Sequence, residues 1–243
     1  MDSLEICHLT DIGGKSTNED KLLAKRFNGL HLLAVADGLG GQTAGEIASS
    51  VALVEIEGTL KTKLKEEDIR NTVKEAVSKA NKEIYLLSKE NPAYSGMGTT
   101  LVMALVWQGK ASIANVGDSR AYHLSGSQIR QITRDHSVVQ ELLERGLITT
   151  EESRHHPQRS SLTRALGIEP EVRVDIYDIE LLPGDIVLLC SDGLSDSLKD
   201  EEISEVISSS VNLDGACANL IERAKKKDAR DNISVILARE NKG

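Results

Sequence analysis

Apolar residues follow two different spacings along this chain, and the spacings predict its secondary structure. Residues 31–36 form a short apolar run that stops at an Asp-Gly pair, which predicts a buried strand. In residues 68–89 apolar side chains recur every three or four positions, which predicts an amphipathic helix. Thr43 and Glu46 have the spacing of a capping box, so another helix is expected to start there. Its apolar face is expected to contain Ile47, Val51 and Val54.

The spacing changes in the second half of the chain. Four short strands separated by tight turns are predicted at 99–106, 111–116, 120–124 and 128–132. Because parallel strands need a long crossover, this spacing predicts an antiparallel meander. Further strands are predicted at 172–178, 185–190 and 233–238, and helices from Asp135 to Arg145, at 200–208 and at 216–226. Together these elements indicate antiparallel sheets covered by helices, an α+β fold. No linker or repeat interrupts residues 1–243, so one domain is expected.

Charge and composition exclude several classes of protein. The 243 residues include 29 Lys and Arg against 38 Asp and Glu, a formal charge of −9. An acidic chain is a poor candidate for binding nucleic acid or anionic lipid. The aromatic content is 2%, too low for a platform that stacks nucleic-acid bases.

Cysteine usage and apolar run length indicate the compartment. Cys7, Cys190 and Cys217 are scattered and form no CxxC pair, which argues against a zinc ribbon or a disulfide scaffold and fits a reducing cytosol. The longest apolar runs, such as 101–107, are far too short to cross a membrane. The residues 1–9 lack the pattern of a signal peptide, so a cytoplasmic protein is expected.

Several carboxylates stand at the ends of predicted strands, mostly beside glycine. A carboxylate in such a place can face a ligand, because glycine lets the backbone approach closely. Each Asp-Gly or Asp-Asn pair alone is more often only a turn, but several converging strand ends would form an oxygen cage suited to Mg²⁺ or Mn²⁺. The candidate residues are Glu19, Asp20, Asp37, Asp118, Asp192 and Asp231.

Two glycine-rich strings imitate nucleotide-binding motifs. Gly13-Gly14-Lys15-Ser16 resembles the end of a phosphate-binding loop, but the first glycine of that motif is replaced by Leu9. Gly38-Leu39-Gly40 resembles the start of a dinucleotide fingerprint, but Thr43 stands at its third glycine position. Both interpretations are rejected.

Eight motifs occur in an order that identifies a family. They are Lys15-Ser-Thr-Asn-Glu19-Asp20, Asp37-Gly38-Leu-Gly40-Gly41, Gly98-Thr-Thr100, Gly117-Asp118-Ser-Arg120, Asp135-His136-Ser137, Leu162-Thr-Arg-Ala-Leu-Gly167, Ser191-Asp192-Gly193-Leu194 and Asp231-Asn232-Ile-Ser234. From about Thr10 to Arg239, the chain resembles the metal-dependent protein phosphatases of the 2C type, most closely the compact bacterial and archaeal members. The resemblance implies a four-layer α-β-β-α sandwich in which helices flank two stacked antiparallel sheets.

The resemblance also implies an activity, which is hydrolysis of phosphoserine and phosphothreonine in proteins with two Mg²⁺ or Mn²⁺ ions. Asp37 would bridge the two metals and the Gly38 carbonyl would ligate one of them, while Asp192 and Asp231 would complete the second metal's shell. Glu19 and Asp20 would act partly through water, and Asp118 with Asp192 would hold a third, weaker metal. A water that bridges the metals would attack phosphorus directly. No Cys-x5-Arg loop offers a cysteine nucleophile instead.

Two positions depart from the family pattern. Lys15 replaces the usual phosphate-binding Arg, so phosphate binding should survive with looser orientation. Leu39 stands where some relatives have a histidine that can protonate the leaving group, so water, His155 or His156 would have to do so. Both histidines belong to residues 146–161, which match the family's flap, and they are more readily explained as surface residues of that flap.

A rival to the enzyme is a non-catalytic, phosphoprotein-binding regulatory module on the same fold. Such a module should have lost metal-binding carboxylates, and this chain retains Asp37, Asp192 and Asp231. The expected partners are phosphorylated proteins and a cognate Ser/Thr kinase, and the protein is expected to be a monomer.

Overall fold

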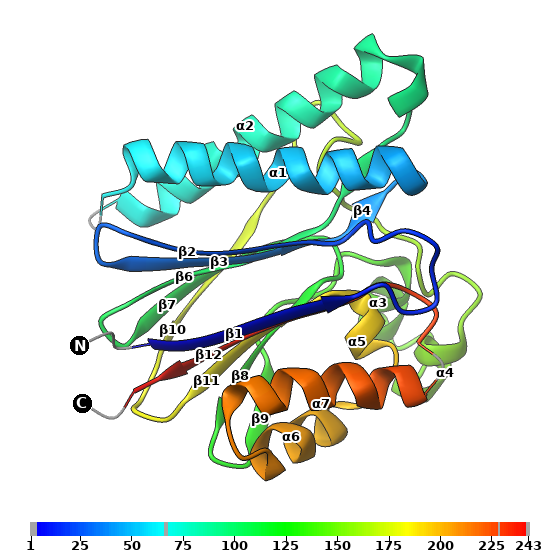
Figure 1. Cartoon of the computed structure of the whole chain (residues 1–243). Coiled ribbons are helices and arrows are strands. Elements are labelled where there is room, and N and C mark those ends of the chain that lie inside the picture. Colours follow the sequence, from blue (N-terminus) through cyan, green and yellow to red (C-terminus); the bar gives the residue numbers. More distant parts are fainter. Residues whose placement is uncertain (1–3, 66–67, 228, 242–243) are drawn as a thin grey trace.

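The computed structural model describes residues 4–65, 68–227 and 229–241, and its strands form two antiparallel sheets and a short ribbon (Figure 1). Sheet A contains, in order, β1 (Leu4–Asp11), β12 (Ile233–Glu240), β11 (Ile186–Cys190), β8 (Arg120–Ser125) and β9 (Gln128–Gln131). Sheet B contains β10 (Asp175–Glu180), β7 (Lys110–Val116), β6 (Leu101–Trp107), β3 (Leu30–Ala36) and β2 (Lys21–Phe27). The ribbon pairs β4 (Gly38–Leu39) with β5 (Gly98–Thr99).

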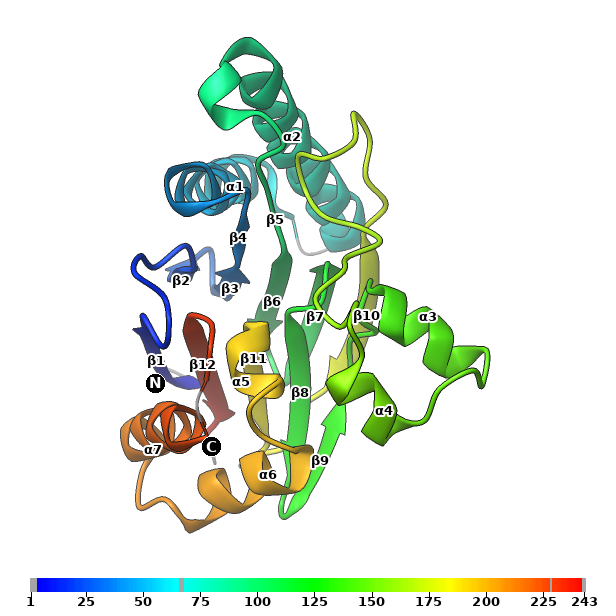
Figure 2. The same ribbon diagram turned by 90° about the vertical axis from the view of Figure 1, so that its right-hand side faces the viewer.

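Helices cover the outer faces of both sheets (Figures 1 and 2). Those on sheet B are α1 (Gln42–Lys63) and α2 (Ile69–Glu90), and those on sheet A are α6 (Asp200–Ser209) and α7 (Leu213–Lys226). Shorter helices are α3 (Val138–Glu144), α4 (Thr150–His155), α5 (Asp192–Ser195) and a 3-10 turn at Pro92–Tyr94. The four layers confirm the α-β-β-α sandwich that the family resemblance implies.

Apolar side chains fill all three spaces between these four layers. Leu32 and Ala34 of β3 pack toward α1 and α2, whereas Leu33 and Val35 pack into the space between the two sheets. All four are completely buried. Because β3 is covered on both faces, its sequence is apolar except for His31 and shows no polar alternation.

The start and the buried face of α1 differ from the prediction. The helix starts at Gln42 and is preceded by Gly40 and Gly41, which have φ of +112° and +89°. Glycine adopts this backbone conformation far more easily than threonine does, so the chain enters the helix through Gly41 and the capping box predicted at Thr43 is wrong.

The buried face of α1 is built mainly from alanines and long aliphatic residues. Ala48, Ala52 and Ile56 are completely buried, whereas Val54 is 66% exposed. The prediction is therefore wrong for Val54, although Ile47 and Val51 do pack against the core. The small alanines let the helix lie close to its neighbours. The buried face of α1 is therefore the one that carries Ala48 and Ala52, and Val54 is exposed to solvent.

The predicted meander is also divided between the sheets. The hairpin of β6 and β7 belongs to sheet B, and the hairpin of β8 and β9 belongs to sheet A. The turn at Gly117 and Asp118 is therefore a crossover between sheets, which places Asp118 where the two sheets meet. The other predicted strands and helices are present with shifted ends, while β1, β2, β4, α4, α5 and the 3-10 turn were not predicted.

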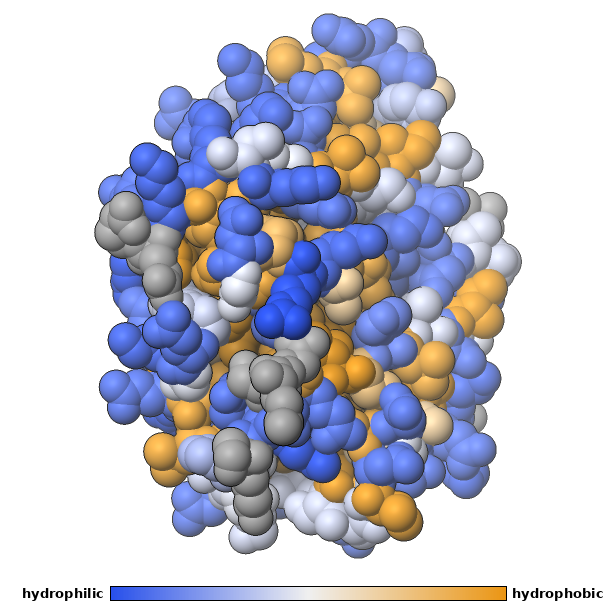
Figure 3. All heavy atoms as spheres, turned by 60° about the vertical axis from the view of Figure 1, so that its left-hand side comes forward, coloured by the Kyte–Doolittle hydropathy of each residue, from blue (hydrophilic) through white to orange (hydrophobic). Residues whose placement is uncertain are grey.

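The surface is dominated by polar and charged side chains. Figure 3 shows one face, on which apolar residues appear between hydrophilic ones. In the described part of the chain, no helix combines the length and the apolar character that crossing a membrane would require.

The space between the sheets should contribute strongly to stability. We expect Leu33→Ala to lower the free energy of unfolding by about 2–5 kcal/mol, because it leaves a cavity in a completely buried layer. Val211→Ala, at a fully exposed position, should change it by less than about 0.5 kcal/mol. Urea denaturation of both variants checks this, and equal losses would show that Leu33 is not a core residue in solution.

Candidate active site

Loops from both sheets meet at one end of the sandwich, around a cavity of about 100 Å³. They are the β1–β2 loop, the end of β3, the β7–β8 crossover, the start of α5 and the start of β12 (Figure 1). Among the residues lining the cavity are Lys15, Glu19, Asp37, Gly38, Asp118, Asp192 and Asp231. Asp20 is the one predicted site residue outside this lining, and it is 2% exposed.

Asp37 is held by the backbone around it. Its N–H donates to Thr100 Oγ1 (3.1 Å), and its carbonyl accepts from the Thr100 N–H (2.8 Å). A Cβ on Gly38 would lie 2.2 Å from the carbonyl oxygen of Gly45 in α1. Only glycine allows this approach, so Gly38 brings the end of β3 against the start of α1.

Asp192 and Asp20 come from opposite ends of the sequence. Ser191 Oγ donates to Asp20 Oδ2 (2.8 Å) and accepts from the Ser234 N–H (3.0 Å). A Cβ on Gly193 would lie 2.0 Å from the carbonyl oxygen of Asn232, so α5 lies directly on the start of β12. These contacts place both aspartates beside Asp231.

The side chain of Asn232 fixes the β1–β2 loop. Its amide nitrogen donates to the carbonyls of Ile12 and Thr17, both at 2.9 Å. Its amide oxygen accepts from the Glu19 N–H at 2.8 Å. Asn232 is 3% exposed, so this clamp is protected from water and sets the position of the loop that carries Lys15 and Glu19.

The turn that carries Asp118 is held from two sides. Gly117 has a φ of +107°, and a Cβ there would lie 2.7 Å from the Cβ of Thr100. Its N–H donates to His136 Nδ1 (3.0 Å), so the hydrogen of this buried imidazole is on Nε2, which lies 3.1 Å from Asp175 Oδ2. On the other side, the hydroxyls of Ser119 and Thr100 share a hydrogen bond of 2.7 Å.

Crowding of carboxylates changes their proton affinities. Burial and the neighbouring Asp192 raise the pKa of Asp37 well above its usual value. Burial and the neighbouring Asp118 do the same to the pKa of Asp192. Burial raises the pKa of Asp20 to about 6, and burial together with Asp135 raises that of Asp118 to about 7. Burial and crowding therefore make these carboxyl groups hold their protons more tightly than exposed acids do.

Lys15 supplies a positive charge in the lining of this cavity. Its Nζ lies 2.9 Å from Asp231 Oδ1. Burial acts to lower the pKa of Lys15, but the hydrogen bond and the charge of Asp231 outweigh it, so the pKa is raised. Lys15 is therefore protonated at neutral pH and is placed to bind an anion that enters the cavity.

The donor set suits a hard divalent cation. Asp192 Oδ1 and Asp20 Oδ1 are buried without a hydrogen-bond partner among the described residues, which is costly unless a cation or water is bound. In the described ranges, no three acidic, His or Cys side chains by themselves form a group that could hold a metal ion. Carbonyl oxygens and water would have to complete the coordination, as is usual for Mg²⁺.

The structure argues against a role for the flap histidines. The side chain of His155 is 80% exposed and lies 3.6 Å from Glu151, one turn away in α4. Neither His155 nor His156 lines the cavity, whereas Leu39 does. The interpretation of both histidines as surface residues is therefore the better one.

Four neutral residues that support the site were given no role from the sequence. Each belongs to one of the quoted motifs, but an uncharged side chain gives no sign of which backbone group it will hold. They are Thr100, His136, Ser191 and Asn232.

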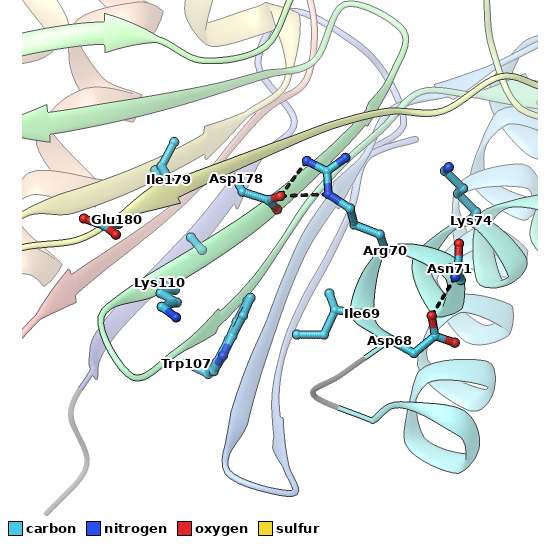
Figure 4. Close-up of a pocket in the computed structure, with 11 residues that line it drawn as sticks. Asp68, Ile69, Arg70, Asn71, Lys74, Trp107, Lys110, Asp178, Ile179 and Glu180 are labelled. Carbon is cyan, nitrogen blue, oxygen red and sulfur yellow. Dashed lines mark hydrogen bonds and ion pairs between the residues drawn. The ribbon is translucent and has the colours of Figure 1, made fainter.

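A larger hollow of about 670 Å³ lies elsewhere, between α2 and the far ends of β6 and β7 (Figure 4). In its lining, Arg70 forms an ion pair with Asp178 and Asn71 donates to Asp68. Trp107 lines it at the end of β6 opposite to Thr100. This hollow lacks the uncompensated carboxylates of the smaller cavity, which is the better candidate for catalysis.

Comparison with known proteins agrees with this fold. The protein phosphatase 2C family model matches residues 10–238, so the chain belongs to the protein phosphatase 2C family. The chain is 38% identical over 237 residues to the serine/threonine phosphatase Stp of Listeria innocua. The aligned region covers 96% of this chain and 91% of that protein.

Solved structures show the same similarity. Serine/threonine phosphatase Stp1 of Staphylococcus aureus superposes with a TM-score of 0.94 at 36% identity, covering 99% of this chain and 96% of that one. The catalytic domain of the phosphatase PstP, solved with two manganese ions, gives a TM-score of 0.87 at 34% identity, with 98% and 99% covered. These similarities confirm the family identified from the eight motifs.

The raised pKa of Asp118 predicts a pH effect on the metal-free protein. Asp118 has a pKa of about 7 in the folded state against an ordinary 3.8. Between these values the folded protein holds a proton that the unfolded chain has lost, so stability should fall as pH rises through this window. In EDTA, Asp118→Asn should flatten this decline in melting temperature. An unchanged slope, equal to that of the exposed control Glu180→Gln, would contradict the assignment.

The contact between His136 and Gly117 predicts opposite outcomes for two variants. His136→Asn can still place an oxygen near Nδ1 to accept from Gly117, whereas His136→Gln places its amide near Nε2 and leaves that N–H without an acceptor. We expect Gln to weaken Mn²⁺ binding about tenfold and Asn to retain most of it, measured by calorimetry. Equal losses in both variants would mean that this hydrogen bond does not position Asp118.

Proposed function

We propose that this chain is a protein serine/threonine phosphatase that hydrolyses phosphoserine and phosphothreonine in other proteins. The observation that carries the proposal is the convergence of Asp37, Asp118, Asp192 and Asp231 with Lys15 on one small cavity. Family membership supports it, as does the activity in the names of relatives that match over nearly the whole chain. All 243 residues would act as one catalytic domain, in which residues 146–161 form a flap containing α4.

Two Mg²⁺ or Mn²⁺ ions fit the donor set, and a third is compatible with it. Asp37 would be shared between two ions, and the Gly38 carbonyl, Asp192 and Asp231 would complete their protein ligands. Glu19 and Asp20 would act from nearby, partly through water, and Asp118 with Asp192 would hold the third ion. When bound, such ions neutralise phosphoryl oxygens and lower the pKa of water.

The chain's own groups position the substrate. Lys15 would bind a phosphate oxygen as a point charge, oriented by its ion pair with Asp231. Leu39 has no proton to give, and neither flap histidine lines the cavity, so water would protonate the leaving alkoxide. Thr100 and Asn232 would keep the loops fixed while charge is redistributed, which keeps the site preorganised.

The rival function, a regulatory module that only binds phosphoproteins, is less well supported. Every carboxylate that the family resemblance assigns to a metal is present in this sequence. Asp37, Asp192 and Asp231 line the same cavity. A pure binding site has no need of four carboxylates around one phosphate, because like charges repel the ligand.

Other properties follow from the proposal. Phosphorylated proteins are the expected partners, and a cognate Ser/Thr kinase would generate them. Three free cysteines in the described residues fit a cytoplasmic location. We propose a monomer as the working state.

The proposal is tested with a phosphothreonine peptide. Purified protein should release phosphate with Mn²⁺ and release none in excess EDTA. Asp37→Asn should lower kcat by about 100-fold or more, because a neutral amide is a poor bridging ligand, and should keep a melting temperature near that of the wild type. Glu180→Gln, an exposed change at the other end of sheet B, should leave the rate unaltered.

The outcomes separate the alternatives. Turnover that survives chelation would refute the metal-dependent mechanism. A wild-type protein that binds Mn²⁺ and phosphopeptide without releasing phosphate would favour the binding module.

A further inference from the structure

A second hollow, of about 510 Å³, opens beside the carboxylate cavity. Leu39, Ser160 and Leu162 line both spaces, so the two share one wall. The proposed mechanism gives this neighbouring hollow no task. Its position makes it the first surface that a substrate chain meets on leaving the cavity in this direction.

The hollow has an apolar wall that is open to solvent. Ile168 is 44% exposed, although it is a large aliphatic residue. A Cβ on Gly98 would lie 2.8 Å from Ile168 Cδ1, and Gly98 pairs with Leu39 across the β4–β5 ribbon. The missing side chain at Gly98 thus lets Ile168 lie on the ribbon near Leu39. The apolar lining consists of Leu39, Leu162, Ala165, Ile168 and Val172.

Charges in the hollow disfavour an acidic occupant. Arg164 and Arg173 each lie 3.3 Å from the same carboxylate, Asp175, which compensates one of their two positive charges. Glu169 and Glu171 also line the hollow and are exposed. An acidic side chain would meet these two carboxylates, whereas an aliphatic one would cover the exposed face of Ile168.

The geometry of an extended peptide selects the position of the occupant. The cavity of about 100 Å³ has room for a phosphoryl group and ions but not for a peptide. In an extended chain, neighbouring side chains point to opposite faces, and those two positions apart share a face roughly 7 Å apart. With the phosphate in the cavity, the side chains directed at the same surface are those two residues from the phosphothreonine.

The hollow on the other side of the cavity has a different character. It measures about 570 Å³ and shares Asp118 and Asp192 with the carboxylate cavity. Its lining has seven acidic and four basic residues against two large aliphatic ones, Val139 and Leu143. This mainly charged space offers less to an aliphatic group. An apolar substrate side chain is therefore directed toward Ile168.

We propose that the hollow beside Leu39 and Ile168 is a substrate-specificity subsite that takes an aliphatic side chain two residues from the phosphothreonine. This inference rests on the phosphatase function proposed above. It assigns the enzyme a preferred class of phosphopeptide, aliphatic and not acidic at that position.

Three phosphothreonine peptides of equal length test the assignment with Mn²⁺ present. The first has Leu at both positions two residues from the phosphothreonine, the second has Asp there, and the third has Leu only at the directly adjacent positions. All other residues are Ser. We expect kcat/KM for the first peptide to exceed that of the others by about fivefold to tenfold, since part of a leucine side chain becomes buried.

Variants identify the surface responsible. Ile168→Asp should reduce the preference for the first peptide to about twofold or less, while Ile168→Leu should retain it. Hydrolysis of p-nitrophenyl phosphate, which has no flanking residues, should stay within about twofold of the wild type in both. The control Leu182→Asp changes an equally apolar residue that is 64% exposed and lines neither hollow. It should leave the peptide preference intact.

Each result bears on the proposal in a defined way. Equal kcat/KM values for the three peptides, with p-nitrophenyl phosphate turned over normally, would overturn the subsite and leave the phosphatase function standing. A preference that persists in Ile168→Asp would place the selective surface elsewhere and likewise overturn it. Failure to hydrolyse any of the four substrates would overturn the proposed function, and the subsite with it.

Discussion

Mutual repulsion among carboxylates is the constraint on which the rest of this structure depends. Two like charges about 4 Å apart repel by about 4 kcal/mol in a partly buried environment, and several such groups surround one small cavity. Burial, and then this repulsion, raises the pKa values of Asp37 and Asp192. The fold must hold these groups together whenever their charges are uncompensated, and it does so from outside the cavity.

The supports are neutral hydrogen-bonding groups and missing side chains. Thr100, Ser191 and Asn232 each bind backbone or carboxylate atoms of a loop that carries an acid. A cationic support would compensate the acids directly and compete with a metal ion, whereas an amide or hydroxyl fixes geometry without doing so. Gly38 and Gly193 serve the same end, since any larger residue would push neighbouring segments apart.

Asp37 and Asp192 could be predicted at strand ends from the sequence because each follows a buried strand. The apolar run before Asp37 and that before Asp192 are both covered on two faces, so strand and site residue could be recognised together. The edge strands β1 and β2 gave no such signal. In β1 only Leu4 and Cys7 are buried, and in β2 no residue is, so neither shows a clear alternation.

Other features could not be predicted from the spacing of residues along the chain. The turn at Gly117 has the length of a hairpin, and only the packing of the two sheets makes it a crossover. The ion pair of Lys15 with Asp231 joins residues that no local spacing relates. The motif around His136 was recognisable, but its role depends on which backbone N–H its imidazole meets.

The clamp made by Asn232 has a consequence for how the protein is made. Its amide holds the Glu19 N–H across 213 positions of sequence, and β1 is paired along its length with β12. On the ribosome, the loop carrying Lys15 and Glu19 is synthesised well before β12 and can be fixed only after Asn232 has been added. The cavity is therefore completed only when β12 has emerged and paired with β1.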